Sequence, residues 1–119
     1  MRIKKRLCVL LASTALLGGL GLGATSTPAS AASACSGPKA HNNSDGLVFF
    51  KGSYNLKNGP ASECGSIVEV SANTRFYVWC GYYNAYGNLW LYGRISGSET
   101  TGWESFDNFT WITGGWNLC

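Results

Sequence analysis

Three acidic side chains lie close together near the end of the chain, and a single histidine lies in its first half. Paired carboxylates catalyse glycoside hydrolysis when they face each other at roughly 5–9.5 Å in a cleft, and Glu99, Glu104 and Asp107 are the nearest such group. Two of the three lie in or beside turns, so we interpret them as solvated turn residues. His41 belongs to a polar segment without a partner nucleophile. We therefore predict no catalytic residues, no cofactor and no enzymatic activity.

The first 34 residues have the three-part layout of a secretory signal peptide. A basic start precedes an apolar run at 7–24, and two small-residue cleavage signals end at Ala31 and Ala34. A membrane anchor is the alternative for this run, but glycines dilute it and no charged stop follows. A lipid anchor on Cys35 is disfavoured because Ala32 stands where a bulky aliphatic residue is expected. We predict export with cleavage, which gives a secreted protein that acts outside the cell or at the cell wall.

Cysteine chemistry then depends on the four cysteines that remain after cleavage, since Cys8 belongs to the leader. An even number in a short exported chain indicates a disulfide framework, with three possible connectivities. Metal binding is disfavoured because no Cys-x-x-Cys pair exists, so we predict no metal site. Our preferred pairing is Cys64–Cys80, between neighbouring strands, and Cys35–Cys119, between the two ends of the domain.

Charge excludes two classes of partner. Residues 35–119 hold five basic and six acidic side chains, a net charge of −1, so the charge of +3 on the whole chain comes from the leader. A nucleic-acid binder needs a clustered basic face, and a membrane-surface protein needs a polybasic one. We predict neither a nucleic-acid partner nor a membrane partner after cleavage. These 85 residues form one small domain, which we expect to be a monomer.

Turn residues divide this domain into short apolar segments, which is typical of strands in a small sandwich or barrel. No stretch has apolar residues at helical spacing, so we predict an all-β fold. Residues 35–46 are a loose polar lead-in, 47–109 the β domain and 110–119 an aromatic tail. The predicted strands are 47–50, 54–56, 66–70, 74–80, 89–95 and 102–104.

Alternation within two segments predicts which side chains face inward. In the 66–70 strand, Val68 and Val70 share a face that we expect to be half-buried. In the next strand, Phe76, Val78 and Cys80 share one face. Asparagine and glycine at 84–88 predict a turn that joins this strand to the one at 89–95 as a hairpin.

Several short motifs occur in the order found in one known family. They are the segment 54–60 with its Asn-Gly-Pro turn, then 79–80, 86–90, 92–95 and 102–103. This order resembles bacterial Src homology 3-like domains, in particular small exported proteins of actinobacteria. The resemblance covers 47–109 and implies a strongly bent β-barrel of five to seven strands, a long loop from Gly59-Pro60 and a short helical turn at 106–109.

The resemblance also implies a function, since domains of this family commonly bind cell-wall peptides or target a neighbouring hydrolase. No catalytic domain accompanies this one, and neither the terminal cysteines nor the tail belongs to the general pattern. Targeting an enzyme within the same chain is therefore not expected.

Aromatic residues outnumber the aliphatic ones, with 16 rings against 12 of Leu, Ile and Val after residue 34. A domain of this size cannot enclose them all, and clustered exposed rings mark contact surfaces. We predict a ligand-binding groove near the hairpin from Tyr83, Tyr86, Trp90, Tyr92 and Arg94.

For several of these rings, packing competes with ligand contact. We expect core packing for Trp90 and Trp103, and exposure for Tyr83 and Tyr86. Trp111 and Trp116 are expected to anchor the tail.

The sequence therefore favours a secreted, non-enzymatic binding module that recognises a cell-wall peptide or glycan. A secreted inhibitor of an extracellular hydrolase, which would bind an extracellular protein, is the alternative, because a rigid loop loses little entropy on docking. A structural surface protein without a discrete ligand is the third hypothesis.

Overall fold

The structure is a computed structural model that describes residues 33–119, so the predicted signal peptide lies outside the described residues except at its last two positions. A short helical segment at 33–35 precedes an all-β domain with one 3-10 turn. Its elements are β1 (Leu47–Phe50), β2 (Tyr54–Lys57), β3 (Ser66–Val70), β4 (Arg75–Tyr83), β5 (Leu89–Ile95), β6 (Thr101–Ser105), η2 (Phe106–Asn108) and β7 (Phe109–Thr113).

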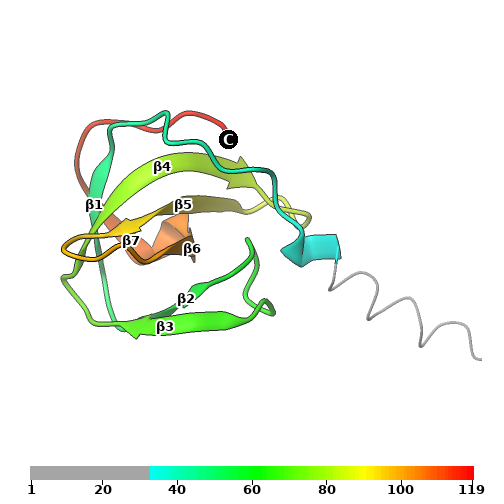
Figure 1. Cartoon of the computed structure of the whole chain (residues 1–119), viewed down its shortest axis with the longest axis horizontal. Helices are drawn as coiled ribbons and strands as arrows, with labels where there is room; N and C mark the ends of the chain where they lie inside the picture. Colours follow the sequence, from blue (N-terminus) through cyan, green and yellow to red (C-terminus); the bar gives the residue numbers. More distant parts are fainter. Residues whose placement is uncertain (1–32) are drawn as a thin grey trace, which may run out of the picture. The chain divides into compact units, whose positions relative to one another are not determined.

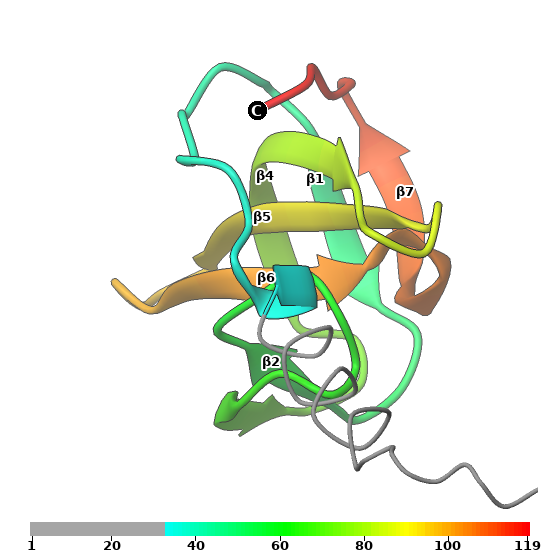
Figure 2. The ribbon, with the colours of Figure 1, turned by 90° about the vertical axis from the view of Figure 1, so that its right-hand side faces the viewer.

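The seven strands form one antiparallel sheet in the order β3-β2-β6-β5-β4-β1-β7. No pairing joins β3 to β7 within the described chain, so the sheet is not the closed barrel that we predicted. The β2–β3 hairpin lies below β4 and β5 in Figure 1, and β4, β5 and β6 run side by side in Figure 2. The sheet therefore curls over its own inner face.

The core fills this inner face. Its buried members come from six of the seven strands: Val48, Phe50, Leu56, Val70, Phe76, Val78, Leu91 and Phe109. Three of them, Phe50, Phe76 and Phe109, contact one another with ring centroids 4.8–5.6 Å apart. Such ring pairs add about 0.5–1.5 kcal/mol each beyond the burial of their area.

The turn residues gave the ranges of several strands correctly, but the predicted burial of β3 was wrong in part. The ranges of β1, β3 and β5 agree with the predictions, and the β4–β5 hairpin is confirmed. Phe76, Val78 and Cys80 are all buried, but a register shift between Val78 and Cys80 breaks the expected alternation. Phe76 and Val78 belong to the core cluster, and Cys80 does not. Val68, however, is 43% exposed, because β3 lies at the edge of the sheet and only Val70 at its end reaches the core.

The predicted aromatic tail begins as a strand. Residues 109–113 pair with β1 as β7, directly after the 3-10 turn that the family resemblance had suggested. Trp111 and Trp116 both pack against the core, as expected for anchors of the tail. Gly81 leaves room for this packing, since a Cβ there would lie 2.5 Å from the ring of Trp116.

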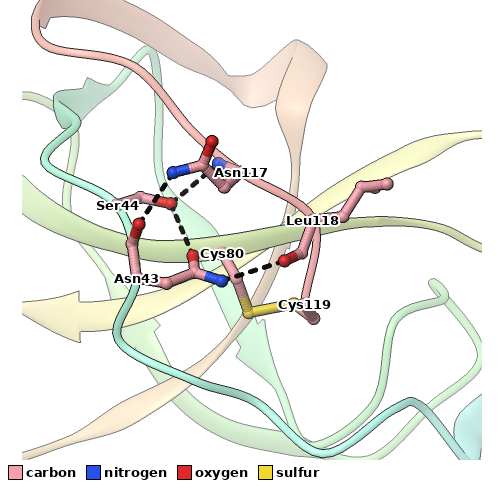
Figure 3. Close-up of a disulfide and its surroundings, with 6 residues drawn as sticks. All are labelled: Asn43, Ser44, Cys80, Asn117, Leu118 and Cys119. Carbon is pink, nitrogen blue, oxygen red and sulfur yellow. Dashed lines mark hydrogen bonds between the residues drawn. A yellow bond between two sulfur atoms is a disulfide. The ribbon is translucent and has the colours of Figure 1, made fainter.

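We predicted a loose lead-in, but its polar side chains form hydrogen bonds with the tail. Asn43 Nδ2 donates to the carbonyl of Leu118 at 3.0 Å, and the N–H of Asn117 donates to Ser44 Oγ at 2.8 Å (Figure 3). Asp45 accepts from the N–H of Gly115 at 2.9 Å. The tail then runs parallel to β4, where the N–H of Gly81 donates to the carbonyl of Asn117.

All four described cysteines form disulfides, but our preferred pairing was wrong. Cys35 pairs with Cys64, and Cys80 pairs with Cys119. Cys64 follows β2, whose neighbours are β3 and β6, so it is not adjacent to β4, whereas the tail brings Cys119 beside Cys80. A thioether lipid on Cys35 would need the sulfur that this disulfide uses.

We predict that replacing both Cys80 and Cys119 by Ala lowers the free energy of unfolding by about 4 kcal/mol, because the bridge closes a long loop in the unfolded chain. Urea unfolding measures the loss. A mass-spectrometric disulfide map of the unaltered protein is the control. Peptides that link Cys64 to Cys80 would contradict the structure.

Candidate functional site

The five predicted binding residues do not form one groove. Tyr83 and Tyr86 lie at the β4–β5 hairpin, and more than half of each side chain is exposed, as expected. The hydroxyl of Tyr86 donates to Glu63 Oε2, which ties the hairpin to the loop after β2. This hydrogen bond lowers the pKa of the Glu63 carboxyl and raises the pKa of the Tyr86 hydroxyl.

Tyr92 and Arg94 are engaged elsewhere, on the outer face of the sheet. The ring of Tyr92 lies between those of Trp79 and Trp103, at centroid distances of 5.6 and 5.2 Å. Arg94 lies over the ring of Tyr77 at 4.9 Å and donates to the carbonyl of Ser98 at 2.8 Å. Arg94 also lines a hollow of about 280 Å³. Both side chains therefore serve packing and local hydrogen bonds.

Trp90, the fifth residue, lines a larger hollow of about 390 Å³ that we call the β2–η2 hollow. Its walls come mainly from β2, β5, β6 and η2, and they include Tyr54, Asn55, Lys57, Trp90, Glu104, Asp107 and Asn108. Trp90 itself is 6% exposed, which confirms the expected packing.

The hollow lies where two strands separate. β2 and β6 share only the pair Lys57 and Trp103, whereas β5 and β6 pair over five positions. β2 also has a register shift between Leu56 and Lys57, and such bulges bend a strand. The hollow lies on the side of this pair that holds Tyr54 and Asn55 of β2, and polar side chains line it.

Glu104 is the most unusual residue of this hollow. It is 3% exposed, and its Oε2 accepts from Asn108 Nδ2 at 2.6 Å and from the N–H of Ser105 at 3.2 Å. Its Oε1 is buried without a hydrogen-bond partner, and no other buried side-chain oxygen or nitrogen in residues 33–119 shares this condition. Burial raises the pKa of this carboxyl above 4.5, although its two donors and the charge of Lys57 act in the opposite direction.

Our interpretation of the acidic residues was wrong for Glu104. Glu99 and Asp107 are exposed, as turn residues should be, but Glu104 is buried within a strand. Sequence reasoning also missed Tyr54, Asn55 and Asn108. A carboxyl in the middle of a predicted strand, next to Trp103, was the one signal that could have indicated a buried polar site.

Comparisons with known proteins identify no relative: no family model matches the chain, and neither a curated protein nor a solved structure shows significant similarity to it. Within the described part of the chain, no three His, Cys, Asp or Glu residues are grouped to hold a metal ion. No helix there is long and apolar enough to cross a membrane. The two disulfides are consistent with an oxidising, extracellular compartment.

Because the pKa of Glu104 is raised in the folded protein, we predict that the stability of the protein depends on pH. Its raised pKa means that the folded protein binds a proton more tightly than the unfolded chain, so the free energy of unfolding falls as the pH rises from about 4.5 through the folded pKa. We expect the Glu104→Gln variant to lack this fall. Thermal unfolding of both proteins across that range measures it. A constant difference between the two melting temperatures would contradict the burial of a titrating carboxyl.

Proposed function

We propose that the protein is a secreted, non-enzymatic binding module that recognises a cell-wall peptide or glycan in the β2–η2 hollow. The observation that carries this proposal is the mixed lining of that hollow. Trp90 and Tyr54 supply rings, and Asn55 and Asn108 supply amides. Ligand sites typically combine apolar and aromatic walls with a few polar groups and enclose about 300–1,000 Å³.

The chemistry of the lining suits this ligand class. Amide side chains both donate and accept hydrogen bonds, as the hydroxyls of a sugar and the amides of a peptide require. Aromatic rings provide the flat apolar surface on which a sugar ring or a peptide packs. The predicted groove near the hairpin is replaced in this proposal by the β2–η2 hollow, and of its five residues only Trp90 is retained.

The Src homology 3-like assignment and export belong to the same proposal. The motif residues lie on strands of the sheet and in the loop after β2: Tyr54 on β2, Gly59-Pro60 in that loop, Trp90 on β5 and Trp103 on β6. A strongly bent antiparallel sheet and a 3-10 turn before the last strand agree with the expected architecture. Export is supported by the leader and by the two disulfides.

A specific observation favours inhibition of an extracellular hydrolase as the second candidate. The β4–β5 hairpin carries two exposed rings, Tyr83 and Tyr86, on a well-braced turn. Asn84 is buried; its Nδ2 donates to the carbonyl of Pro60 at 2.8 Å, and its Oδ1 accepts from the N–H groups of Tyr86 and Asn88. A rigid loop of this kind loses little entropy on binding a protein.

The binding proposal predicts that the protein lacking residues 1–34 sediments with purified bacterial peptidoglycan. Asn55 is exposed and lines the hollow. An Asn55→Trp substitution would fill the hollow and should reduce the retained fraction by about tenfold, since excluding a ligand removes its contacts.

A matched control is Thr113→Trp, on an exposed position of β7 that does not line the hollow. Its retention should equal that of the unaltered protein. Failure of the unaltered protein to sediment would refute the proposed function. Equal retention of both tryptophan variants would show that the ligand binds outside the β2–η2 hollow.

The second candidate predicts loss of protease or glycosidase activity when the protein is added to a culture filtrate. A Tyr83→Ala, Tyr86→Ala double variant should relieve this inhibition, because exposed tyrosines are frequent anchors of protein interfaces. The Asn55→Trp variant should inhibit normally. No inhibition by the unaltered protein would remove this candidate.

A further inference from the structure

Glu104 is held from one side only. Residue 104 lies opposite Leu91 of the core in the β5–β6 pairing, and it also lines the β2–η2 hollow. Both of its hydrogen-bond donors, Asn108 and the N–H of Ser105, bind the same oxygen, Oε2. The other oxygen, Oε1, has no donor, although only 3% of the residue is exposed.

A buried carboxylate with one unbonded oxygen is more stable when another donor binds that oxygen. An ionised carboxylate has about four acceptor positions, and a buried acceptor without a partner destabilises the fold by about 1–3 kcal/mol, or more when it is charged. Nearly all buried polar groups in proteins have a partner. The described chain supplies no donor to Oε1. Because Glu104 lines the β2–η2 hollow, a group bound in the hollow is the candidate for this donor.

The charge of the hollow selects the kind of donor. Asp107 and Glu104 are acidic, and Lys57 is the basic residue that lines the hollow with them. The ammonium of Lys57 donates to Ser66 Oγ at 3.2 Å on β3. Hydrogen bonds from a cation to a carboxylate are about twice as strong as neutral ones. A hollow with two acids and one base therefore favours a cationic donor.

We propose that the β2–η2 hollow recognises a primary ammonium group on its ligand, and that the carboxylate of Glu104 accepts its hydrogen bond. The inference rests on the proposed function and narrows its ligand to a cell-wall peptide that carries a free amine, as against a neutral glycan. Trp90 and Tyr54 then pack against the rest of the peptide, and Asn55 and Asn108 bind its amides.

Capping the amines of the wall tests this proposal directly. Purified peptidoglycan, whose stem peptides carry primary amines, is divided, and one half is N-acetylated. We expect the protein lacking residues 1–34 to bind the untreated half and to bind the acetylated half about tenfold less, as loss of one charged hydrogen bond implies.

The outcomes separate the two proposals. Binding to neither half refutes the proposed function itself. Equal binding to both halves overturns the ammonium inference and leaves the proposed function standing. Loss of binding in the presence of EDTA would identify a metal ion as the cation and would also overturn the inference.

A variant comparison adds an independent readout. Glu104→Gln keeps the shape of the side chain but removes its charge, so it should bind both halves equally weakly. Glu99→Gln, at an exposed acid that does not line the hollow, should behave as the unaltered protein. If the first variant does not fold, the acetylation experiment on the unaltered protein still decides the question.

The pH dependence of binding is a further test of the proposal. Titratable groups around Glu104 are Lys57 and Tyr54 on β2 and Asp107 on η2, and Leu91 opposite it is apolar. Because the carboxylate form is the acceptor, retention on untreated wall should rise with pH through the Glu104 pKa, which lies above 4.5. The Glu104→Gln variant should lack this rise. A fall in retention over the same range would mean that the neutral acid binds, and would overturn the inference.

Discussion

Strands β2 and β6 meet through a single residue pair, Lys57 opposite Trp103. This narrow junction is where the sheet turns over, because the β2–β3 hairpin must fold below the other strands for Leu56 and Val70 to join the core. The two strands pair only at this position, where the sheet turns over. The β2–η2 hollow is therefore a consequence of the curl, and its walls are strands and a capped turn whose positions the core determines.

The position of Glu104 is fixed by the residues that follow it. The strand ends at Ser105, whose Oγ accepts from the N–H of Asp107 at 3.4 Å and caps η2. The turn then places Asn108 beside the carboxyl, at 2.6 Å from Oε2. A carboxyl held in this way loses little conformational freedom when it accepts a further bond, which favours binding. The energetic disadvantage of its burial is therefore consistent with a role in recognition.

Local sequence was sufficient for six of the seven strands, but not for β7 or for contacts between distant segments. Glycine and asparagine punctuate the chain, and the ranges of β1, β3 and β5 followed from them. The disulfide pairing depends on where the tail returns to β4, which no local pattern encodes. Period-two alternation would not have indicated the burial of both Trp103 and Glu104 on β6. Both faces of that strand are covered, one by Tyr92 and the other by Asn108.

The surplus of aromatic residues has a structural explanation that changes where a ligand should be sought. The sheet has its core on its inner face, and within residues 33–119 no second sheet covers the outer face. Edge-to-face contacts link Trp79 to Tyr92, Tyr92 to Trp103 and Trp103 to Tyr82 across β4, β5 and β6. These rings cover the outer face, so their abundance does not by itself indicate a binding groove. Recognition is better sought where the packing is interrupted and polar groups are left incompletely bonded, and in the described chain that place is the junction of β2 with β6.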